Sequence, residues 1–111
     1  MVGGMYIIDL SSKNITDLTA FRDCADKLRD LQWLSLDNNQ ISDNALRPLA
    51  TLVNLQRLFL HENQISDVRP LATLVNLQEL SLDWNQISDV SPLATLFNLS
   101  GSLGYKITSL T

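Results

Sequence analysis

The sequence predicts an α/β solenoid, a fold in which short and similar coils stack on one another. A 13-residue unit recurs at 31–43, 55–67 and 77–89, and the copies agree at seven or more positions. Each copy contains Leu-x-Leu, the alternation of a short strand whose leucines point inward. No coil of this size can bury its own apolar face, so neighbouring coils must share one core and their strands must form a parallel sheet.

The spacing of the copies predicts one domain, residues 1–111, made of coils of unequal length. We place the coils at 5–30, 31–54, 55–76 and 77–98, with a degenerate closing coil at 99–111. The extra length lies in the back halves, where loops and short helices tolerate insertion. Residues 105–110 match the stretch after the strand of earlier copies only if two residues are deleted. A closing coil and a frayed tail therefore remain alternatives.

The back half of the first coil predicts an amphipathic helix over residues 19–29. Leu18, Phe21, Ala25 and Leu28 are spaced three or four apart and would form its apolar stripe. Cys24 lies beside that stripe, and we expect it to pack at the margin as a small buried hydrophobic residue.

Three columns of polar residues and prolines recur at fixed positions and are best explained by the scaffold. The asparagines should fill the turn after each strand and satisfy backbone groups there. The aspartates should cap free N–H groups, and the prolines should begin short helices. The columns are Asn39, Asn63 and Asn85; Asp43, Asp67 and Asp89; and Pro48, Pro70 and Pro92.

The pattern L-x-x-L-x-L-x-x-N-x-I-x-D, with its Pro-Leu-Ala-Thr-Leu tail, resembles the leucine-rich repeat family. The closest class is the internalin type, with repeats near 22 residues. This resemblance implies a short right-handed solenoid with a parallel β-sheet on the concave face and short helices or 3-10 turns on the convex face. It also implies a recognition module. The helical cap that precedes the array in internalins has no counterpart before the first coil, which leaves the apolar ends open.

Function in such arrays is expected at the outward positions that vary between copies, because the scaffold does not dictate them. Three of these positions carry large aromatic residues, Trp33, Phe59 and Trp84. They step diagonally across coils whose strands lie about 4.8 Å apart. Exposed aromatic residues of this kind often dominate binding surfaces. The alternative is that these rings pack on one another or on a second copy.

The same outward positions are strongly acidic. They hold five carboxylates and one cation, which equals the formal net charge of −4 for the whole chain. A partner protein with a basic or mixed surface would complement them. The charged residues are Asp9, Asp37, Glu62, Glu79, Asp83 and Arg57.

His61 shares one column with Asp37 and Asp83, and the three side chains could approach across neighbouring strands. Two carboxylates and one imidazole on an open face lack the convergence of zinc or iron sites, so we expect no metal and no cofactor. No Ser-His-Asp or Cys-His arrangement and no phosphate-binding loop is evident, so we expect no catalytic residues and no enzyme activity.

Composition and charge limit the classes of partner that the chain is expected to bind. The acidic balance disfavours nucleic acid, and no apolar run reaches the roughly 18 residues that a membrane span requires. No signal peptide is recognisable and the lone cysteine makes no internal disulfide, so cytoplasmic placement is the default. The sequence therefore favours a protein–protein interaction module that binds through its concave strand face. The alternative is a structural or self-assembling array that forms homo-oligomers through its uncapped ends.

Overall fold

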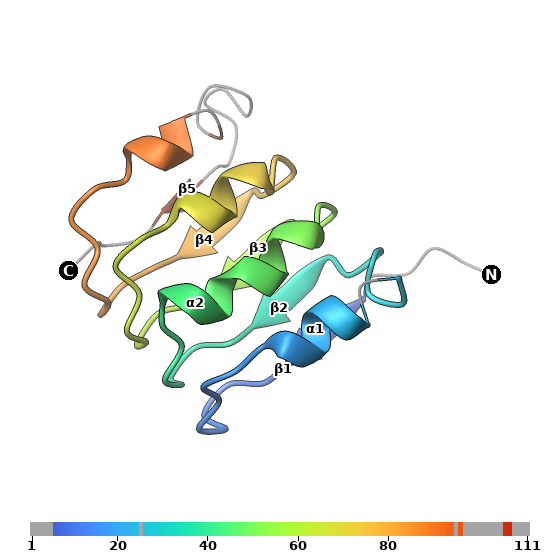
Figure 1. Ribbon diagram of the computed structural model, residues 1–111. Coiled ribbons are helices and arrows are strands. Elements are labelled where there is room, and N and C mark those ends of the chain that lie inside the picture. The colour runs from blue at the N-terminus through green and yellow to red at the C-terminus, as the bar shows by residue number, and fades with distance from the viewer. Residues whose placement is uncertain (1–5, 25, 95, 97–105, 108–111) are drawn as a thin grey trace.

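A computed structural model describes residues 6–24, 26–94, 96 and 106–107 of the chain. Its strands form one parallel sheet in the order β1-β2-β3-β4-β5, so that each strand lies beside its neighbours in the sequence. Figure 1 shows the short helices on one side of this sheet, with one coil stacked on the next. The predicted leucine-rich-repeat solenoid is confirmed.

The strands are only two or three residues long, and their register repeats from coil to coil. They are β1 (Ile7–Asp9), β2 (Trp33–Ser35), β3 (Arg57–Phe59), β4 (Glu79–Ser81) and β5 (Lys106–Ile107). Leu34 lies opposite Leu58, and Leu58 lies opposite Leu80. All three leucines are fully buried. The residues on either side of them in each strand therefore point away from the core.

The back halves are short helices, and the expected prolines lie at the starts of the 3-10 helices among them. The helices are α1 (Thr19–Asp23), α2 (Asp43–Leu46), and the 3-10 helices η1 (Arg47–Thr51), η2 (Arg69–Thr73) and η3 (Ser91–Leu93). A proline occupies the first or second position of each 3-10 helix, where its fixed φ angle suits a helix start. The two extra residues of the second coil form α2 together with their neighbours, which makes its back half longer than those of the third and fourth coils.

The aliphatic side chains of all coils fuse into one core. The inward leucines and isoleucines of the second and third coils are completely buried. In the first coil, by contrast, Ile8, Leu10 and Ile15 are only partly buried, and Tyr6 and Ile7 are exposed by 44% and 54%. Burial is thus complete in the middle of the array and incomplete at its first coil, for which the described residues supply a neighbouring coil on one side.

The predicted helix in the first coil is too long. Helix α1 ends at Asp23, and the chain then turns, with the N–H groups of Lys27 and Leu28 donating to the Cys24 carbonyl. The turn allows Leu28 to pack partly against the core while the chain returns to β2. Cys24, the residue that follows the helix, is exposed. Its predicted burial at the edge of the apolar stripe is therefore wrong.

The register of the last strand also differs from the prediction. Residues 105–110 were aligned with the stretch that follows each strand, but Lys106 pairs with Glu79 and Ile107 pairs with Leu80. These two residues therefore occupy strand positions, and the chain adds a fifth parallel strand to the sheet. Residues 99–105 and 108–111, the rest of the predicted closing coil, lie outside the described residues.

The turn asparagines have the predicted role, and each also joins two coils. Asn63 Nδ2 donates to the carbonyls of Leu60 and His61 in its own turn and to Leu36 in the preceding coil. Its Oδ1 accepts the N–H of Ile41 at 2.9 Å. Asn39 and Asn85 make the corresponding bonds. A buried polar ladder thus runs beside the leucine core and satisfies backbone groups that the turns leave unpaired.

The repeated aspartates cap backbone N–H groups as predicted, with one difference. Asp67 and Asp89 each accept the N–H two residues later, that of Arg69 or Ser91. Asp43 instead reaches the next coil, where it accepts the N–H groups of Ser66 and Asp67. The inserted α2 begins at Asp43 and turns its carboxylate toward that neighbour.

Within the described residues, no helix is both long enough and apolar enough to cross a membrane.

Candidate protein-binding site on the strand face

The outward side chains of β2, β3 and β4, with those of the turn after each strand, form a surface that we call the strand face. Trp33 on β2 and Phe59 on β3 pack together near its centre, with ring centroids 5.1 Å apart and planes inclined by 56°. Tilted packing at this distance is a favourable arrangement for two aromatic rings. The diagonal step predicted for these two residues is confirmed. Their ring contact is the packing that the alternative to partner binding expects for this pair.

The register explains why Phe59 fits in this place. It lies opposite Ser35 on one side and Ser81 on the other. Both serines are small and buried, with 7% and 8% exposure, although they point outward from the core. The ring therefore occupies room that two larger neighbours would fill. Trp33 and Phe59 remain half-buried, so part of each ring is still accessible.

Trp84 lies apart from this pair, in the turn after β4, and is 71% exposed. Among the described residues it makes no ring contact. Its backbone is in the left-handed region with φ of 59°, like the equivalent residues of the other coils, Ser12, Asn38 and Glu62. Glycine and asparagine tolerate this conformation, whereas a bulky side chain is unfavourable there. The scaffold therefore gives no reason for a tryptophan at this position.

The single cation of the strand face is committed to one of its carboxylates. Arg57 and Glu79 lie opposite each other on β3 and β4, with Arg57 Nε 3.9 Å from Glu79 Oε1. Both side chains are partly exposed, so the pair contributes little to stability. At the first coil, hydrogen bonds from the N–H and the hydroxyl of Ser11 lower the pKa of Asp9. Asp9 is thus a carboxylate at neutral pH.

His61 joins the three central coils. Its Nε2 lies 3.4 Å from Asp37 Oδ2, and its Nδ1 lies 3.0 Å from the hydroxyl of Ser81. The other oxygen of Asp37 accepts the hydroxyl of Ser35 at 2.5 Å. The predicted approach of His61 to Asp37 is confirmed. On the other side, however, its described partner is Ser81 rather than Asp83.

This network corrects one sequence-based statement. No Ser-His-Asp arrangement was evident in the sequence, yet Asp37, His61 and Ser81 follow one another across three coils, with an ion-pair distance between Asp37 and His61 and a hydrogen bond between His61 and Ser81. The register that brings them together is not visible in a linear motif. The Ser81 residue is only 8% exposed, which leaves its hydroxyl little accessible to a substrate. The network can tie coils together, and it holds the imidazole and one carboxylate in fixed positions.

Asp83 continues the column beyond His61. Its Oδ1 is buried, and no described residue donates a hydrogen bond to it. A buried acceptor without a donor costs about 1–3 kcal/mol. Glu62, in the neighbouring turn, is exposed.

Within the described part of the chain, no group of three or more His, Cys, Asp or Glu residues is arranged to hold a metal ion.

Comparison with protein families identifies the class of this chain. A family model described as Leucine Rich repeats (2 copies) matches residues 53–95, and one described as Leucine Rich Repeat matches residues 30–52. The chain belongs to the leucine-rich repeat family, which is commonly used for protein binding and is generally non-catalytic. No curated protein matches the chain.

Solved structures support the internalin-type class. Internalin C2 of Listeria monocytogenes is 39% identical, with a TM-score of 0.77, over 96% of this chain and 51% of that one. Internalin F of the same organism is 32% identical with a TM-score of 0.75, over 96% of this chain and 30% of that one. A leucine-rich repeat protein of Leptospira interrogans is 31% identical with a TM-score of 0.68, over 94% and 25%. The chain thus spans about half of internalin C2 and less of the others.

Proposed function

We propose that the chain is a protein-binding module that holds a partner protein on its strand face. The observation that carries this proposal is the Trp33–Phe59 ring pair at the centre of the sheet, partly accessible and flanked by acidic side chains. Aromatic side chains supply much of the binding energy in protein interfaces, because they bury large apolar areas with little loss of conformational freedom. The family's common use in protein binding supports the same function.

The partner's expected surface follows from charge. Arg57 is paired with Glu79, and of the other strand-face carboxylates, Asp37, Glu62 and Asp83, only Asp37 has a close basic partner among the described residues, His61. Asp9, on the neighbouring strand β1, adds a further carboxylate, with Lys13 near it. A partner that presents Lys or Arg side chains around an apolar protrusion would complement this surface. Because these charges are partly exposed, we expect the affinity for such a partner to fall as the salt concentration rises.

The direct test is affinity capture with the strand face removed. The intact chain is immobilised and exposed to a lysate of its native source, beside a variant with Trp33→Ala, Phe59→Ala and Trp84→Ala. We expect the intact chain to retain a partner that the triple variant loses, while circular dichroism shows both folded. A matched control is the Val53→Ala, Val75→Ala variant, because both valines are exposed, by 42% and 48%, but lie after η1 and η2. It should capture the partner normally.

Retained capture by the triple variant would contradict the proposal, since the proposed contact surface would then be unnecessary. Equal loss in the valine variant would contradict it too. In that case any reduction of exposed apolar area would suffice.

A second candidate is a self-assembling array, and the open first coil favours it. Tyr6 and Ile7 are exposed there, and Ile8 is only partly buried. An edge strand with apolar neighbours is a suitable surface for pairing between copies. Light scattering at high protein concentration would reveal dimers or larger species, and Ile7→Lys should dissociate them. A strict monomer would exclude this candidate.

We propose no catalytic role for the Asp37, His61 and Ser81 network. A serine nucleophile must reach the substrate and needs donors aimed at the developing oxyanion. The low exposure of Ser81 argues against such access. Hydrolysis of model esters that is lost in His61→Ala would reverse this view.

A further inference from the structure

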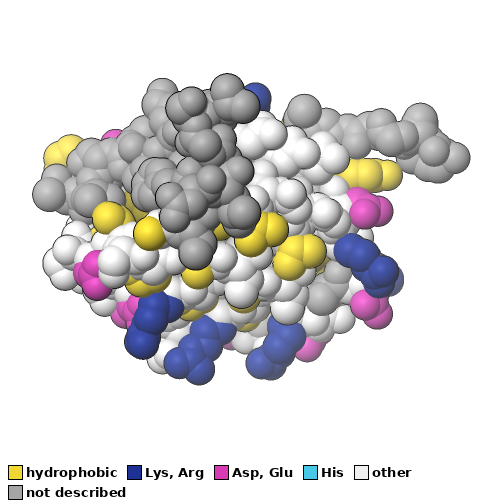
Figure 2. Space-filling view, turned by 90° about the horizontal axis from the view of Figure 1, so that it is seen from above, with side chains coloured by type: hydrophobic (Ala, Val, Ile, Leu, Met, Phe, Trp, Pro, Cys, Tyr) yellow, Lys and Arg dark blue, Asp and Glu magenta, His cyan; other side chains and the backbone are white. Residues whose placement is uncertain are grey.

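The helical side of the molecule carries an arginine in each of its first three coils. Arg22 lies on α1, Arg47 begins η1, and Arg69 begins η2. In Figure 2, basic side chains stand in a row along the side that carries the helices in Figure 1, with acidic side chains beside them. These arginines lie opposite the acidic strand face, on a surface that the proposed function leaves unused.

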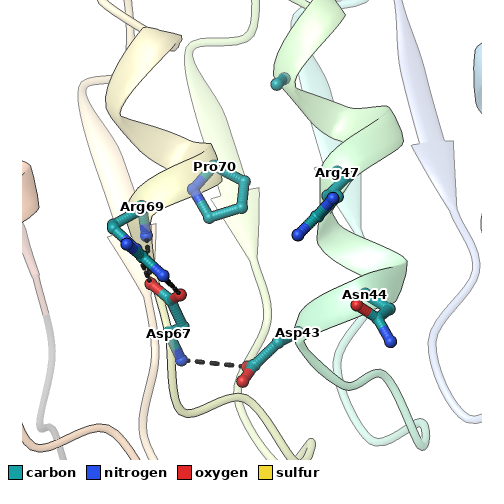
Figure 3. A pocket seen from close by; sticks show the side chains of 7 residues that line it. Asp43, Asn44, Arg47, Asp67, Arg69 and Pro70 are labelled. Carbon is teal, nitrogen blue, oxygen red and sulfur yellow. Dashed lines mark hydrogen bonds and ion pairs between the residues drawn. The ribbon is translucent and has the colours of Figure 1, made fainter.

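Grooves between successive coils bring the three arginines next to one another. Arg22 and Arg47 both line the groove between the first and second coils. Arg47 and Arg69 both line the next groove, which has a volume of about 490 Å³. Figure 3 shows these two side chains on opposite sides of it, with Pro70 between them. The arginines therefore belong to one continuous surface that crosses three coils.

The carboxylates of the second groove are already occupied. Asp43 accepts the N–H and the hydroxyl of Ser66 and the N–H of Asp67. Asp67 accepts the backbone N–H of Arg69 and three hydrogen bonds from its guanidinium, the shortest of 2.6 Å. Both carboxylates thus have donors on each of their two oxygens, and Arg69 is held in place by Asp67.

Arg47 is different, because no hydrogen bond or close ion pair joins its guanidinium to a described residue, although its charge helps to lower the pKa of Asp67. It projects into the groove from the side opposite Arg69. A guanidinium has five N–H donors and no acceptor, so it leaves an excess of donors in a groove whose carboxylates are satisfied. The ligand that complements such a surface is an acceptor with negative charge.

We propose that the groove between the second and third coils binds carboxylate side chains of an acidic segment from a partner protein, with Arg47 as the principal contact. The planar guanidinium matches a carboxylate in a two-pronged geometry that a lysine cannot reproduce. Ala50 and Pro70 line the groove as small apolar groups and leave room for the segment's backbone. Arg22, in the adjoining groove, extends the contact to a second carboxylate. The chain would then bind partners of opposite charge on its two sides.

The proposal can be tested with a synthetic peptide of alternating Glu and Ser residues, titrated calorimetrically into the full chain at low salt. A peptide with Gln in place of Glu is the ligand control. We expect the Glu peptide to bind and the Gln peptide not to bind. Arg47→Gln should weaken binding of the Glu peptide by about tenfold, because it removes charge-assisted hydrogen bonds. Rising salt should weaken the remaining binding.

Two protein variants make the test specific. Arg29→Gln removes an exposed arginine that lines neither groove and pairs with Asp26, so it should bind the Glu peptide like the intact chain. The strand-face variant lacking Trp33, Phe59 and Trp84 should also bind it normally. Failure of the strand-face proposal would therefore leave this result unchanged.

Three outcomes would overturn the proposal. The first is equal binding of the Glu and Gln peptides, and the second is equal weakening by Arg47→Gln and Arg29→Gln. The third is evidence that the groove binds something other than a carboxylate segment. Such evidence would be tighter binding of a phosphoserine peptide of the same length, or self-association in sedimentation experiments that Arg47→Gln abolishes. Arg47 is exposed, so its replacement should leave the thermal unfolding curve unchanged and the comparison valid.

Discussion

The side-chain oxygen of Asn63 accepts a hydrogen bond from the backbone N–H of Ile41, in the preceding coil, at 2.9 Å. The N–H of Gln64 returns a bond to the Ile41 carbonyl at 2.9 Å. Both backbone groups of Ile41 are therefore satisfied by the next coil. Leucine packing alone permits neighbouring coils to slide, whereas these directional bonds fix their register.

Replacing Asn63 with Ala should destabilise the fold by about 2–4 kcal/mol, because it leaves the buried N–H of Ile41 without an acceptor and removes one donor from each of three turn carbonyls. Urea denaturation followed by circular dichroism measures the change. The control is Gln64→Ala at the next position, where the side chain is exposed. A loss equal to that of the control would show that the asparagine ladder is unimportant.

The stability of the chain should fall in acid, partly through Asp43. Burial raises the pKa of this carboxyl, but hydrogen bonds from the Ser66 hydroxyl and from the N–H groups of Asp67 and Ser66 outweigh it. The folded-state pKa therefore lies below the ordinary 3.8. A lowered pKa means that the carboxylate stabilises the fold above the unfolded-state value, and that this contribution is lost as the pH falls through the folded-state value.

Asp43→Asn keeps one oxygen for the Ser66 and Asp67 N–H groups but cannot ionise. We expect the variant to be less stable than the intact chain by about 1–2 kcal/mol near neutral pH. The difference should shrink as the pH falls through the folded-state pKa, which lies below 3.8. Urea midpoints across this pH range measure it, with Asp26→Asn as the exposed control. A constant difference at every pH would contradict the assignment.

The Trp33–Phe59 ring contact should be measurable as a coupling between two mutations. In a double-mutant cycle with Trp33→Ala and Phe59→Ala, we expect a coupling free energy of about 0.5–1.5 kcal/mol. Denaturant unfolding of the four proteins provides the values. A coupling near zero would mean that the rings stabilise the fold independently, and that they remain fully available to a partner.

We expect Trp84 to lower the stability of the fold and to strengthen partner binding. Its left-handed backbone suits Asn better than Trp, so Trp84→Asn should raise stability by about 1 kcal/mol. The same variant should bind the partner less well, as is common where a function opposes stability. Thermal unfolding and partner capture are measured on the same preparation. A variant that is both less stable and fully active would contradict both expectations.

The regular coils were predictable because their periodicity repeats with little noise. Leu34, Leu58 and Leu80 occupy equivalent buried positions, and the prolines begin the short helices where expected. The strand-face neighbours Trp33 and Phe59 followed from the same register. Whether these side chains bind a partner stays a prediction, since a repeat pattern specifies where a side chain points and leaves open what it touches.

The irregular parts were not predictable, each for a physical reason. The stripe after Leu18 fits a longer helix, but tertiary packing ends α1 at Asp23. The contact of His61 with Ser81 joins residues 20 apart in sequence and depends on side-chain conformations. Asn54 and Asn76 escaped notice altogether. They donate to carbonyls of the preceding coil, and their recurrence 22 residues apart was the available signal.

The asparagine bonds give the array a direction. The side-chain oxygens of Asn39, Asn63 and Asn85 accept the backbone N–H groups of Ile15, Ile41 and Ile65. In each case the asparagine of the following coil satisfies a backbone group of the coil before it. Shortening the chain from its end would strip a hydrogen-bond acceptor from the coil that becomes last. Shortening it from its beginning would remove only a coil whose backbone N–H donates to the asparagine of the next coil. Deletion from opposite termini should therefore be unequally tolerated, and unravelling should start more readily where the tie to a successor is lost.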